Sequence, residues 1–576
     1  MQGGSERTDA TRAATSDARS GAAAAPTREL DWPRHWPLWL FAGYAALALA
    51  IYWPAIDGPF VSDDFAYLVS HPYTSPLSWE NVRAILDPFG PAKLYAANYE
   101  PVHLLLTALE LHIFADAMRG YHLVNVAIHA LCALLLSAWL RRADLGFAAA
   151  LFGGLFFLVH PANVEAVAWA SQLKTNAALA FALGAILAWQ RAPLAAALLF
   201  ACSLLTKASG LFALPTVAAL AFAQGSRALP AARWLALWVV ALALFAIPEM
   251  QSFAHLGAVE VEAYGDPWVH ARSVAAVGSR YLVMAATGWG VSAFQEPAPT
   301  LSWTDPWWLA SLPLGVAIGA RSVRALARRS AEGAFWVAAA ASFAPVSQIF
   351  PFLNPVADRY LYFILPGLIG GALCWGREVA VRWIPPARER VAGLVAAGLG
   401  AALLLGFAGW SASRAALWQS ETRLLLDAAR HYPEGGTAHY LRARNAAQRG
   451  DVAQAIASLR IAARSGIDRF NVIDRDPGLA PIREAPEFRA LMRELAQRWI
   501  ELAERRGYET QPELRMLAMA HATRGELEAA VQTFERALAA GGPLDDVLRG
   551  ELAEARSRLA RERASGGGES GGTSAR

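Results

Sequence analysis

The chain has 576 residues, of which 55% are hydrophobic, and its mean hydropathy is +0.28. These values exclude an ordinary soluble protein of this length and predict an integral membrane protein. The net charge of +3 gives no indication of nucleic-acid binding, and the three cysteines lie in apolar runs without a disulfide framework.

The composition changes along the chain and predicts four successive parts. Residues 1–34 are rich in Ala, Ser, Thr, Gly and Arg, which is typical of a disordered tail, here on the cytoplasmic side. Residues 35–412 contain nearly all the apolar runs and predict a transmembrane domain, with the loop 56–120 on its outer side. Residues 413–564 are typical of a soluble helical domain, and the Gly- and Ser-rich residues 565–576 predict a flexible tail.

Apolar runs predict the membrane-spanning helices. A helix needs about 20 apolar residues to cross the hydrocarbon layer, and shorter spans occur inside a bundle. The predicted fold class is therefore all-α, a polytopic helix bundle of about 11 spans followed by helical repeats. The predicted spans are 36–55, 121–140, 147–159, 175–190, 194–206, 209–224, 234–248, 304–320, 334–350, 360–376 and 391–412.

Arginine-rich short loops alternate with longer loops that contain acidic residues, and this alternation predicts the orientation. The basic loops lie at 141–142, 191, 227–233, 321–329 and 377–390. By the positive-inside rule they are cytoplasmic, so the N-terminus is cytoplasmic and the domain after the last span is outside. The apolar stretch 272–294 is predicted to be re-entrant or interfacial, because a crossing there would move the basic loop at Arg321 to the outer side.

The domain at 413–564 contains two segments with the residue spacing of tetratricopeptide (TPR) helix pairs. Each begins at a glycine, Gly450 or Gly525, which allows a tight turn, and continues with alanines that allow two helices to pack closely. Degenerate pairs at 415–432 and 484–507 are predicted to complete the array, since two repeats are fewer than a stable solenoid usually needs.

Two adjacent carboxylates, Asp63 and Asp64, follow the first predicted span in the outer loop. The environment can give such a pair different roles, one as general base and the other as the group that orients it. The plain alternative is a helix cap or a solvated turn.

Other ionisable residues stand at the ends of later spans, where charge is costly and usually lines a cavity. Lys207 and Arg359 suit a lipid phosphate, the arginine through two parallel hydrogen bonds; the alternative is that they snorkel to the headgroup layer. No metal site is predicted, because one histidine and one glutamate five residues apart do not make a ligand set. Further cavity candidates are Glu100, His160, Glu165, Lys174, Tyr360 and Tyr362.

The order of these motifs carries a resemblance to a known family. After the Asp pair come Tyr99-Glu100-Pro101, Tyr121-His122-Leu123-Val124-Asn125, His160-Pro161, Glu165-Ala166-Val167-Ala168-Trp169, Leu204-Leu205-Thr206-Lys207 and Arg359-Tyr360-Leu361-Tyr362. With the repeats at the end, the chain resembles the transmembrane-and-TPR protein O-mannosyltransferases and their bacterial relatives, of the GT-C glycosyltransferase superfamily. The resemblance covers about residues 36–540.

The resemblance implies a polyprenyl-phosphate sugar donor, an acidic base in the first outer loop and basic residues that hold the lipid phosphate. Asp63 and Asp64 match the acidic pair, and Lys207 and Arg359 match recurrent basic positions. The chain departs from the family at Glu100, where arginine is usual, and at Asn163, where a second histidine is frequent, so its donor and acceptor can differ from those of the eukaryotic enzymes.

The predicted function is a membrane glycosyltransferase of the GT-C type. It transfers a hexose, with mannose as one candidate, from a polyprenyl-phosphate donor to a hydroxyl of a protein or glycan acceptor on the extracytoplasmic side, with inversion. No cofactor is required by the prediction, although a divalent cation is left open. The expected location is a bacterial inner membrane with a periplasmic TPR domain that binds a protein or peptide. The alternative is a non-catalytic membrane scaffold that recruits envelope proteins through this domain.

Overall fold

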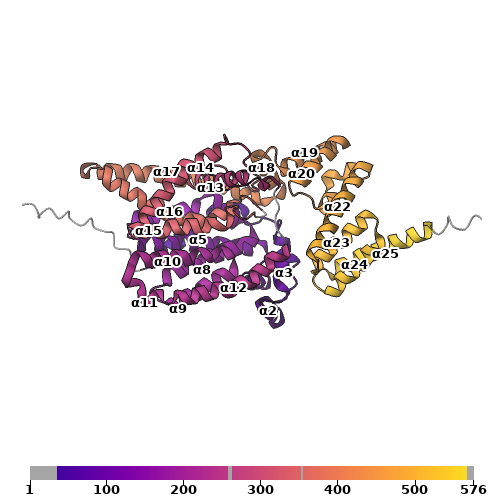
Figure 1. Ribbon diagram of the computed structural model, residues 1–576, viewed down its shortest axis with the longest axis horizontal. Coiled ribbons are helices and arrows are strands. Elements are labelled where there is room, and N and C mark those ends of the chain that lie inside the picture. Colours follow the sequence, from indigo (N-terminus) through magenta and orange to yellow (C-terminus); the bar gives the residue numbers. More distant parts are fainter. Residues whose placement is uncertain (1–34, 257–261, 352–353, 567–576) are drawn as a thin grey trace, which may run out of the picture.

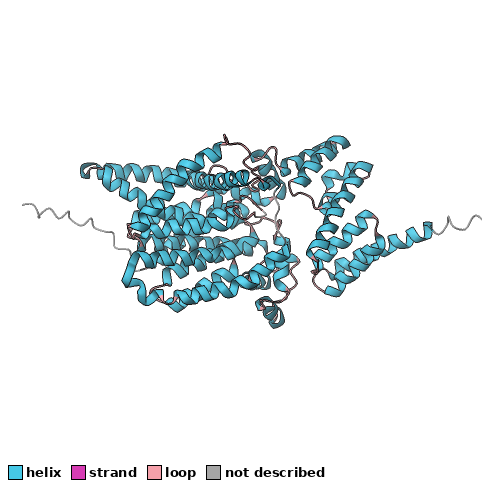
Figure 2. Cartoon of the chain, viewed as in Figure 1, coloured by secondary structure: helices cyan, strands magenta, loops and turns pink. Residues whose placement is uncertain are grey.

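The computed structural model describes residues 35–256, 262–351 and 354–566. Within these ranges every regular element is a helix and no strand is present (Figure 2). The predicted all-α class is therefore confirmed for the described chain. The predicted tail 1–34 and residues 567–576 of the predicted C-terminal tail lie outside the described residues.

Each of the eleven predicted spans contains a helix in the structure. The helices are α1(Trp36–Tyr52), α5(Met118–Arg142), α6(Phe147–Val159), α8(Leu173–Ala188), α9(Pro193–Thr206), α10(Ala213–Gln224), α12(Leu235–Leu256), α14(Pro306–Ala327), α15(Ala331–Phe343), α16(Asp358–Trp383) and α17(Glu389–Ala415). By length and hydropathy, seven helical segments of the described chain can cross a membrane, or eight when the bent pair 147–159 and 161–168 counts as one. The chain is thus an integral membrane protein with seven or eight candidate spans, and the total of eleven stays a prediction.

Small residues set the close approach of α15 and α16 in the bundle core. A Cβ atom on Gly367 would come within 2.4 Å of the backbone nitrogen of Ala339, and one on Gly370 within 2.1 Å of the Phe335 ring. Phe335 and Leu361 have no exposed surface. Helices in a membrane gain little from hydrophobic burial against each other and associate through such close contacts. This packing places the first turn of α16 beside the segments that follow α6.

Short elements occupy the end of the bundle where the predicted outer loops meet. They are η1(Trp53–Ala55), η2(Phe65–Val69), α2(Trp79–Leu86), α3(Ala92–Ala96), α4(Pro101–Phe114), η3(Pro161–Asn163), α7(Val164–Ala168), η4(Ala170–Gln172), η5(Ala208–Phe212), η7(Glu262–Gly265) and η8(Ala344–Val346). At the other turns lie η6(Gly225–Ala228), α11(Leu229–Ala232) and η9(Pro386–Arg388).

Helix α13(Pro267–Thr287) occupies most of the stretch predicted to be re-entrant or interfacial, and it is not among the candidate spans. Near its start, His270 contacts the carbonyl oxygen of Gln348, just after α15, at 2.6 Å. Just past its end, Gly288 lies against Pro161 and Trp410. Both ends therefore lie at the same end of the bundle, in agreement with a helix that does not cross.

A second group of helices follows α17 with no long linker and gathers at one end of the bundle (Figure 1, orange to yellow). Gly450 and Gly525 have φ of 75° and 87°, so both predicted tight turns use the left-handed conformation that glycine adopts without strain. The two predicted helix pairs are present, and their identity as a TPR solenoid stays a prediction. The elements are η10(Ala416–Gln419), α18(Glu421–His431), α19(Gly436–Gln448), α20(Val452–Arg464), α21(Phe470–Arg475), η11(Pro477–Ile482), α22(Pro486–Arg506), α23(Gln511–Arg524), α24(Leu527–Ala540) and α25(Asp545–Gly566). We call residues 416–566 the repeat domain.

Candidate active site

The two adjacent aspartates have opposite environments. Asp64 is 1% exposed, and its carboxylate accepts hydrogen bonds from the backbone N–H of Val61 at 2.9 Å and of Ser171 at 2.7 Å. Asp63 is exposed, and within the described part of the chain no side-chain hydrogen bond or ion pair occupies its carboxylate. Asp64 thus ties the outer loop to the segment after α7, while Asp63 presents a free carboxylate. The structure therefore gives the two carboxylates different environments, one buried and hydrogen-bonded and the other exposed.

The backbone around this pair is strained. Ser62 has φ of 50°, a conformation that a residue with a side chain adopts at a cost. The next element, η2, is a single π-helical turn, a form that occurs mostly at functional sites. The Trp169 indole N–H donates to the Val61 carbonyl oxygen at 3.0 Å and helps to hold the loop. The surrounding structure therefore maintains the conformation that directs Asp63 outward.

Burial raises the pKa of Asp64 to about 7, although the backbone bonds from Val61 and Ser171 act in the opposite direction. The neighbouring charge of Asp63 adds to the rise. Asp64 therefore titrates near neutral pH while it holds the loop.

Lys207 follows α9 directly and lies partly exposed between α9 and η5. Its Nζ donates to the Thr175 hydroxyl at 2.8 Å. Burial, and then the positive charges of Lys174 and Arg359, lower the pKa of Lys207 to about 7. Three cations that repel one another form a site where a bound anion would relieve the repulsion and favour the protonated lysine.

Arg359 is the second residue of α16 and is held by Glu165 of α7. The Arg359 backbone N–H donates to one Glu165 oxygen at 2.7 Å, and its guanidinium donates to the other. The guanidinium also lies over the rings of Trp169 and Tyr360, at 5.5 and 5.1 Å from their centroids. The charges of Arg359 and Asp63 interact. The structure thus brings Asp63, Lys207 and Arg359 into one electrostatic cluster.

Lys174 and Glu100 form the inner part of this cluster. The Lys174 Nζ donates to the Tyr67 hydroxyl at 2.6 Å and lies 3.5 Å from Glu100 Oε1. The same Glu100 oxygen also faces His103, whose Nδ1 lies 3.2 Å from it. Burial alone raises the pKa of Glu100, but the charge of Lys174, and then that of His103, lower it to about 2. Glu100 therefore stays ionised and holds Lys174 in place.

Glu249 is a further carboxylate of this region that sequence reasoning missed. It is buried near the end of α12, and it accepts a hydrogen bond from the Tyr99 backbone N–H at 2.7 Å. Its charge interacts with those of Glu100 and Lys174. The only signal in the sequence was one acidic residue after Pro248 at the end of an apolar run.

Two of the predicted cavity residues lie outside the cluster, in the core. His160 accepts from the Ala162 backbone N–H at 3.2 Å, and its Nε2 lies 3.2 Å from the Ala285 carbonyl oxygen. The Tyr362 hydroxyl meets His129 Nδ1 at 2.9 Å. His160 and Tyr362 have no exposed surface. Glu100, Glu165, Lys174 and Tyr360 all contact or belong to the cluster.

A cleft of about 1210 Å³ leads from this cluster to the repeat domain. On the bundle side it is lined by Ser62, Glu165 and Arg359. Its other wall includes Thr437, Tyr440, Arg444, Asp468, Arg469 and Asp476 of the repeat domain. The volume exceeds the roughly 300–1,000 Å³ of sites for small molecules. An occupant of this cleft would reach Arg359 and the loop of Asp63 from the repeat domain.

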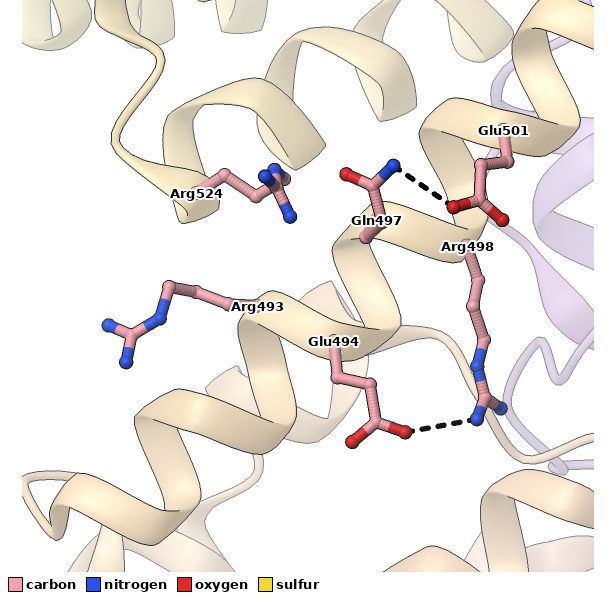
Figure 3. Close-up of a pocket in the computed structure, with 6 residues that line it drawn as sticks. All are labelled: Arg493, Glu494, Gln497, Arg498, Glu501 and Arg524. Carbon is pink, nitrogen blue, oxygen red and sulfur yellow. Dashed lines mark hydrogen bonds and ion pairs between the residues drawn. The ribbon is translucent and has the colours of Figure 1, made fainter.

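A second hollow, of about 550 Å³, lies on the repeat domain alone (Figure 3). Four of its side chains pair with one another: Arg498 bonds Glu494 at 3.0 Å, and Gln497 bonds Glu501 at 3.0 Å. It is a charged, open surface that holds no buried unpartnered group. The lining residues are Arg493, Glu494, Gln497, Arg498, Glu501 and Arg524.

Among the described residues, no group of three or more His, Cys, Asp or Glu side chains is arranged to hold a metal ion.

No family model and no curated protein matches the sequence. Among solved structures, the crystal structure of ArnT from Cupriavidus metallidurans bound to undecaprenyl phosphate aligns at 15% identity, over 87% of this chain and 80% of that chain, with a TM-score of 0.33. A TM-score this low does not assign the two chains to one fold. The class that the helices define is a polytopic helical membrane protein.

Proposed function

We propose that this protein is a membrane glycosyltransferase that moves a hexose from a polyprenyl-phosphate donor to an acceptor hydroxyl on the extracytoplasmic side. One observation carries the proposal: a free carboxylate, Asp63, shares an electrostatic cluster with Lys207 and Arg359 at an end of a membrane bundle. A transfer from a lipid phosphate needs a base for the acceptor and cations for the leaving group, and the cluster supplies both.

In the proposed reaction, the Asp63 carboxylate takes the proton of the acceptor hydroxyl. The acceptor oxygen forms a bond to the anomeric carbon while the bond from that carbon to the phosphate oxygen breaks. The released polyprenyl phosphate carries the extra negative charge, which Lys207 and Arg359 stabilise. A single displacement inverts the configuration of the anomeric carbon. The hydrogen bonds of Asp64 keep the loop of Asp63 in place for this step.

The charge balance of the cluster supports an anionic ligand. Arg359 is partly neutralised by Glu165, and Lys174 by Glu100. Among the residues that the structure describes, the partner of Lys207 is a hydroxyl, that of Thr175. We therefore assign Lys207 as the principal contact of the phosphate and Arg359 as an oriented second donor.

The orientation and the role of the repeat domain belong to the same proposal. The arginine-rich loops indicate a cytoplasmic N-terminus, so the Asp63 loop and the repeat domain are assigned to the outer side. The cleft between Arg359 and the repeat domain is then the path of the acceptor, a protein or a glycan. A scaffold without catalysis would gain nothing from gathering three cations and a free carboxylate, each of which is costly near the membrane.

The experiment uses the full-length protein in vesicles with a radiolabelled polyprenyl-phosphate hexose and envelope extract as acceptor. We expect label to appear in acceptor material together with released polyprenyl phosphate. The Lys207→Met variant should lose most of this transfer. A matched control is Lys93→Met, since Lys93 also lies in the outer loop but bonds Gln251 and the Pro88 carbonyl oxygen. Equal transfer by the Lys207→Met and unsubstituted proteins would contradict the proposal.

A further inference from the structure

A buried polar network joins the repeat domain to the first turn of α16. Arg414, at the end of α17, lies 3.2 Å from Asp427 of α18 and 4.0 Å from Asp358. Asp358 is the first residue of α16 and directly precedes Arg359. All three charged side chains are buried. Charges of this kind are retained at such a cost only where their partners are well ordered.

A loop between α13 and α14 completes the network and connects its two carboxylates. The Asp358 carboxylate accepts from the Ser292 backbone N–H at 3.0 Å and from the Gln295 side chain at 2.6 Å. The Asp427 carboxylate accepts from the Ala293 backbone N–H at 3.0 Å. Adjacent residues of one loop therefore bind the start of α16 and the start of the repeat domain.

The repeat domain holds this loop at two further points. The Tyr432 hydroxyl donates to the Gln295 side-chain oxygen. The Thr437 hydroxyl donates to Glu296 at 2.5 Å, and the Thr437 backbone N–H lies 3.2 Å from the same carboxylate. At Gly435 a Cβ atom would lie 1.9 Å from a Glu296 oxygen, so a side chain there would displace the Glu296 carboxylate. The elbow between α18 and α19 thus fits the loop closely.

The first turn of α16 is consequently held from two sides. Glu165 binds the backbone and side chain of Arg359 from the bundle, and Gln295 and Arg414 hold Asp358 from the repeat-domain side. These contacts form a continuous path from the repeat domain through the loop to Asp358 and the adjacent Arg359.

We infer that Asp358 is a positioning residue for Arg359 and that the repeat domain, through Tyr432, Thr437 and Asp427, is a structural part of the site that holds the donor phosphate. This inference rests on the proposed function for its phosphate ligand, but the mechanical link is independent of it. A shift of the repeat domain by an occupant of the cleft would then change the affinity for the donor, and by reciprocity the donor would change the affinity for that occupant.

The test removes contacts that lie in the repeat domain and touch neither α16 nor Arg359. The variant Tyr432→Phe/Thr437→Val loses the two hydroxyl contacts with the loop. Its matched control is Tyr508→Phe/Thr533→Val, because the Thr533 hydroxyl donates to the Ala529 carbonyl oxygen of its own helix and Tyr508 packs in a core cluster formed by repeat-domain residues. The full-length protein in detergent micelles is used throughout.

Two measurements distinguish a network that positions Arg359 from one that only attaches the repeat domain to the bundle. Hydrogen exchange of backbone amides in the first turn of α16 should become faster in the test variant and not in the control. Affinity for undecaprenyl phosphate, measured with the lipid itself, should fall at least about fivefold in the test variant, the lower end of typical coupling between sites. Asp358→Asn, which keeps the shape and removes the charge opposite Arg414, should change both readouts in the same direction.

Unchanged exchange in α16 and unchanged affinity in the test variant would overturn the inference, and so would equal changes in test and control. A fall in melting temperature without a change in affinity would show that the network only attaches the repeat domain, and this also overturns it. Faster exchange together with no undecaprenyl phosphate binding by the unsubstituted protein would instead overturn the proposed donor, while the link between the repeat domain and α16 would stand.

Discussion

The two aspartates of the outer loop are adjacent in sequence, yet we expect their asparagine variants to fail in different ways. Asp63→Asn removes the proposed base from an exposed, unpaired position, so transfer should fall about 10²- to 10⁴-fold with little change in stability. Asp64→Asn replaces an acceptor of two backbone N–H groups by an amide that can accept only one of them. A buried donor left without a partner costs about 1–3 kcal/mol, so this variant should unfold at a lower temperature.

The pH dependence of the stability should also depend on Asp64. Its pKa rises from 3.8 to about 7 in the folded protein, mainly through burial. The folded state therefore binds the Asp64 proton more tightly than the unfolded state does. The contribution of this proton to the free energy of unfolding is complete below about pH 4 and is lost as the pH rises through 7. In Asp64→Asn this part of the pH dependence of the melting temperature should disappear.

The assay compares transfer from a radiolabelled polyprenyl-phosphate hexose with thermal unfolding of the same preparations. Asp57→Asn is the control, because Asp57 is an exposed carboxylate near the loop and is paired with Arg119. It should leave both transfer and melting temperature close to those of the unsubstituted protein. The reasoning is refuted if Asp63→Asn retains full transfer, or if Asp64→Asn loses transfer at an unchanged melting temperature.

Further predictions concern the phosphate site and the topology. Burial and then neighbouring cations lower the pKa of Lys207 to about 7. Affinity for undecaprenyl phosphate should therefore fall between pH 7 and 9, where the lipid phosphate keeps a constant charge. Lys207→Met should abolish this pH dependence in a binding titration. Arg359→Lys should weaken the same binding about tenfold or more, since lysine cannot bond Glu165 and the phosphate together, and a hydrogen bond to a charged group contributes about 1.5–3 kcal/mol; unchanged affinity would contradict this role. Chelation with EDTA should leave transfer unchanged, because the side-chain cations supply the charge for the leaving group, and a loss restored by magnesium would disprove this. In a single-cysteine labelling scan, positions 63 and 325 should react from opposite sides of the membrane, and reaction from the same side would reverse the assigned topology.

The sequence alone was sufficient to predict features that depend on single residues or short runs: hydropathy, backbone conformation and charge. Hydropathy located a helix in every predicted span, because about 20 apolar residues favour a membrane helix whatever its neighbours are. Glycines at 450 and 525 predicted turns that the structure has, since few other residues adopt a positive φ without strain. The ionisable residues Asp63, Lys207 and Arg359 were selected as candidates for a similar reason, because charge at the end of an apolar run is conspicuous.

Only the tertiary structure decided how these residues are used. Asp63 and Asp64 are equivalent by sequence, and the distant backbone of Ser171 makes one of them structural. Likewise, His160 stands among the predicted cavity residues but is enclosed in the core, whereas Glu249, marked in the sequence by no more than its place after Pro248, joins the cluster from α12. Burial and ion pairing arise from contacts between residues far apart in the chain, so local patterns name the charged groups, and the fold alone determines which of them meet.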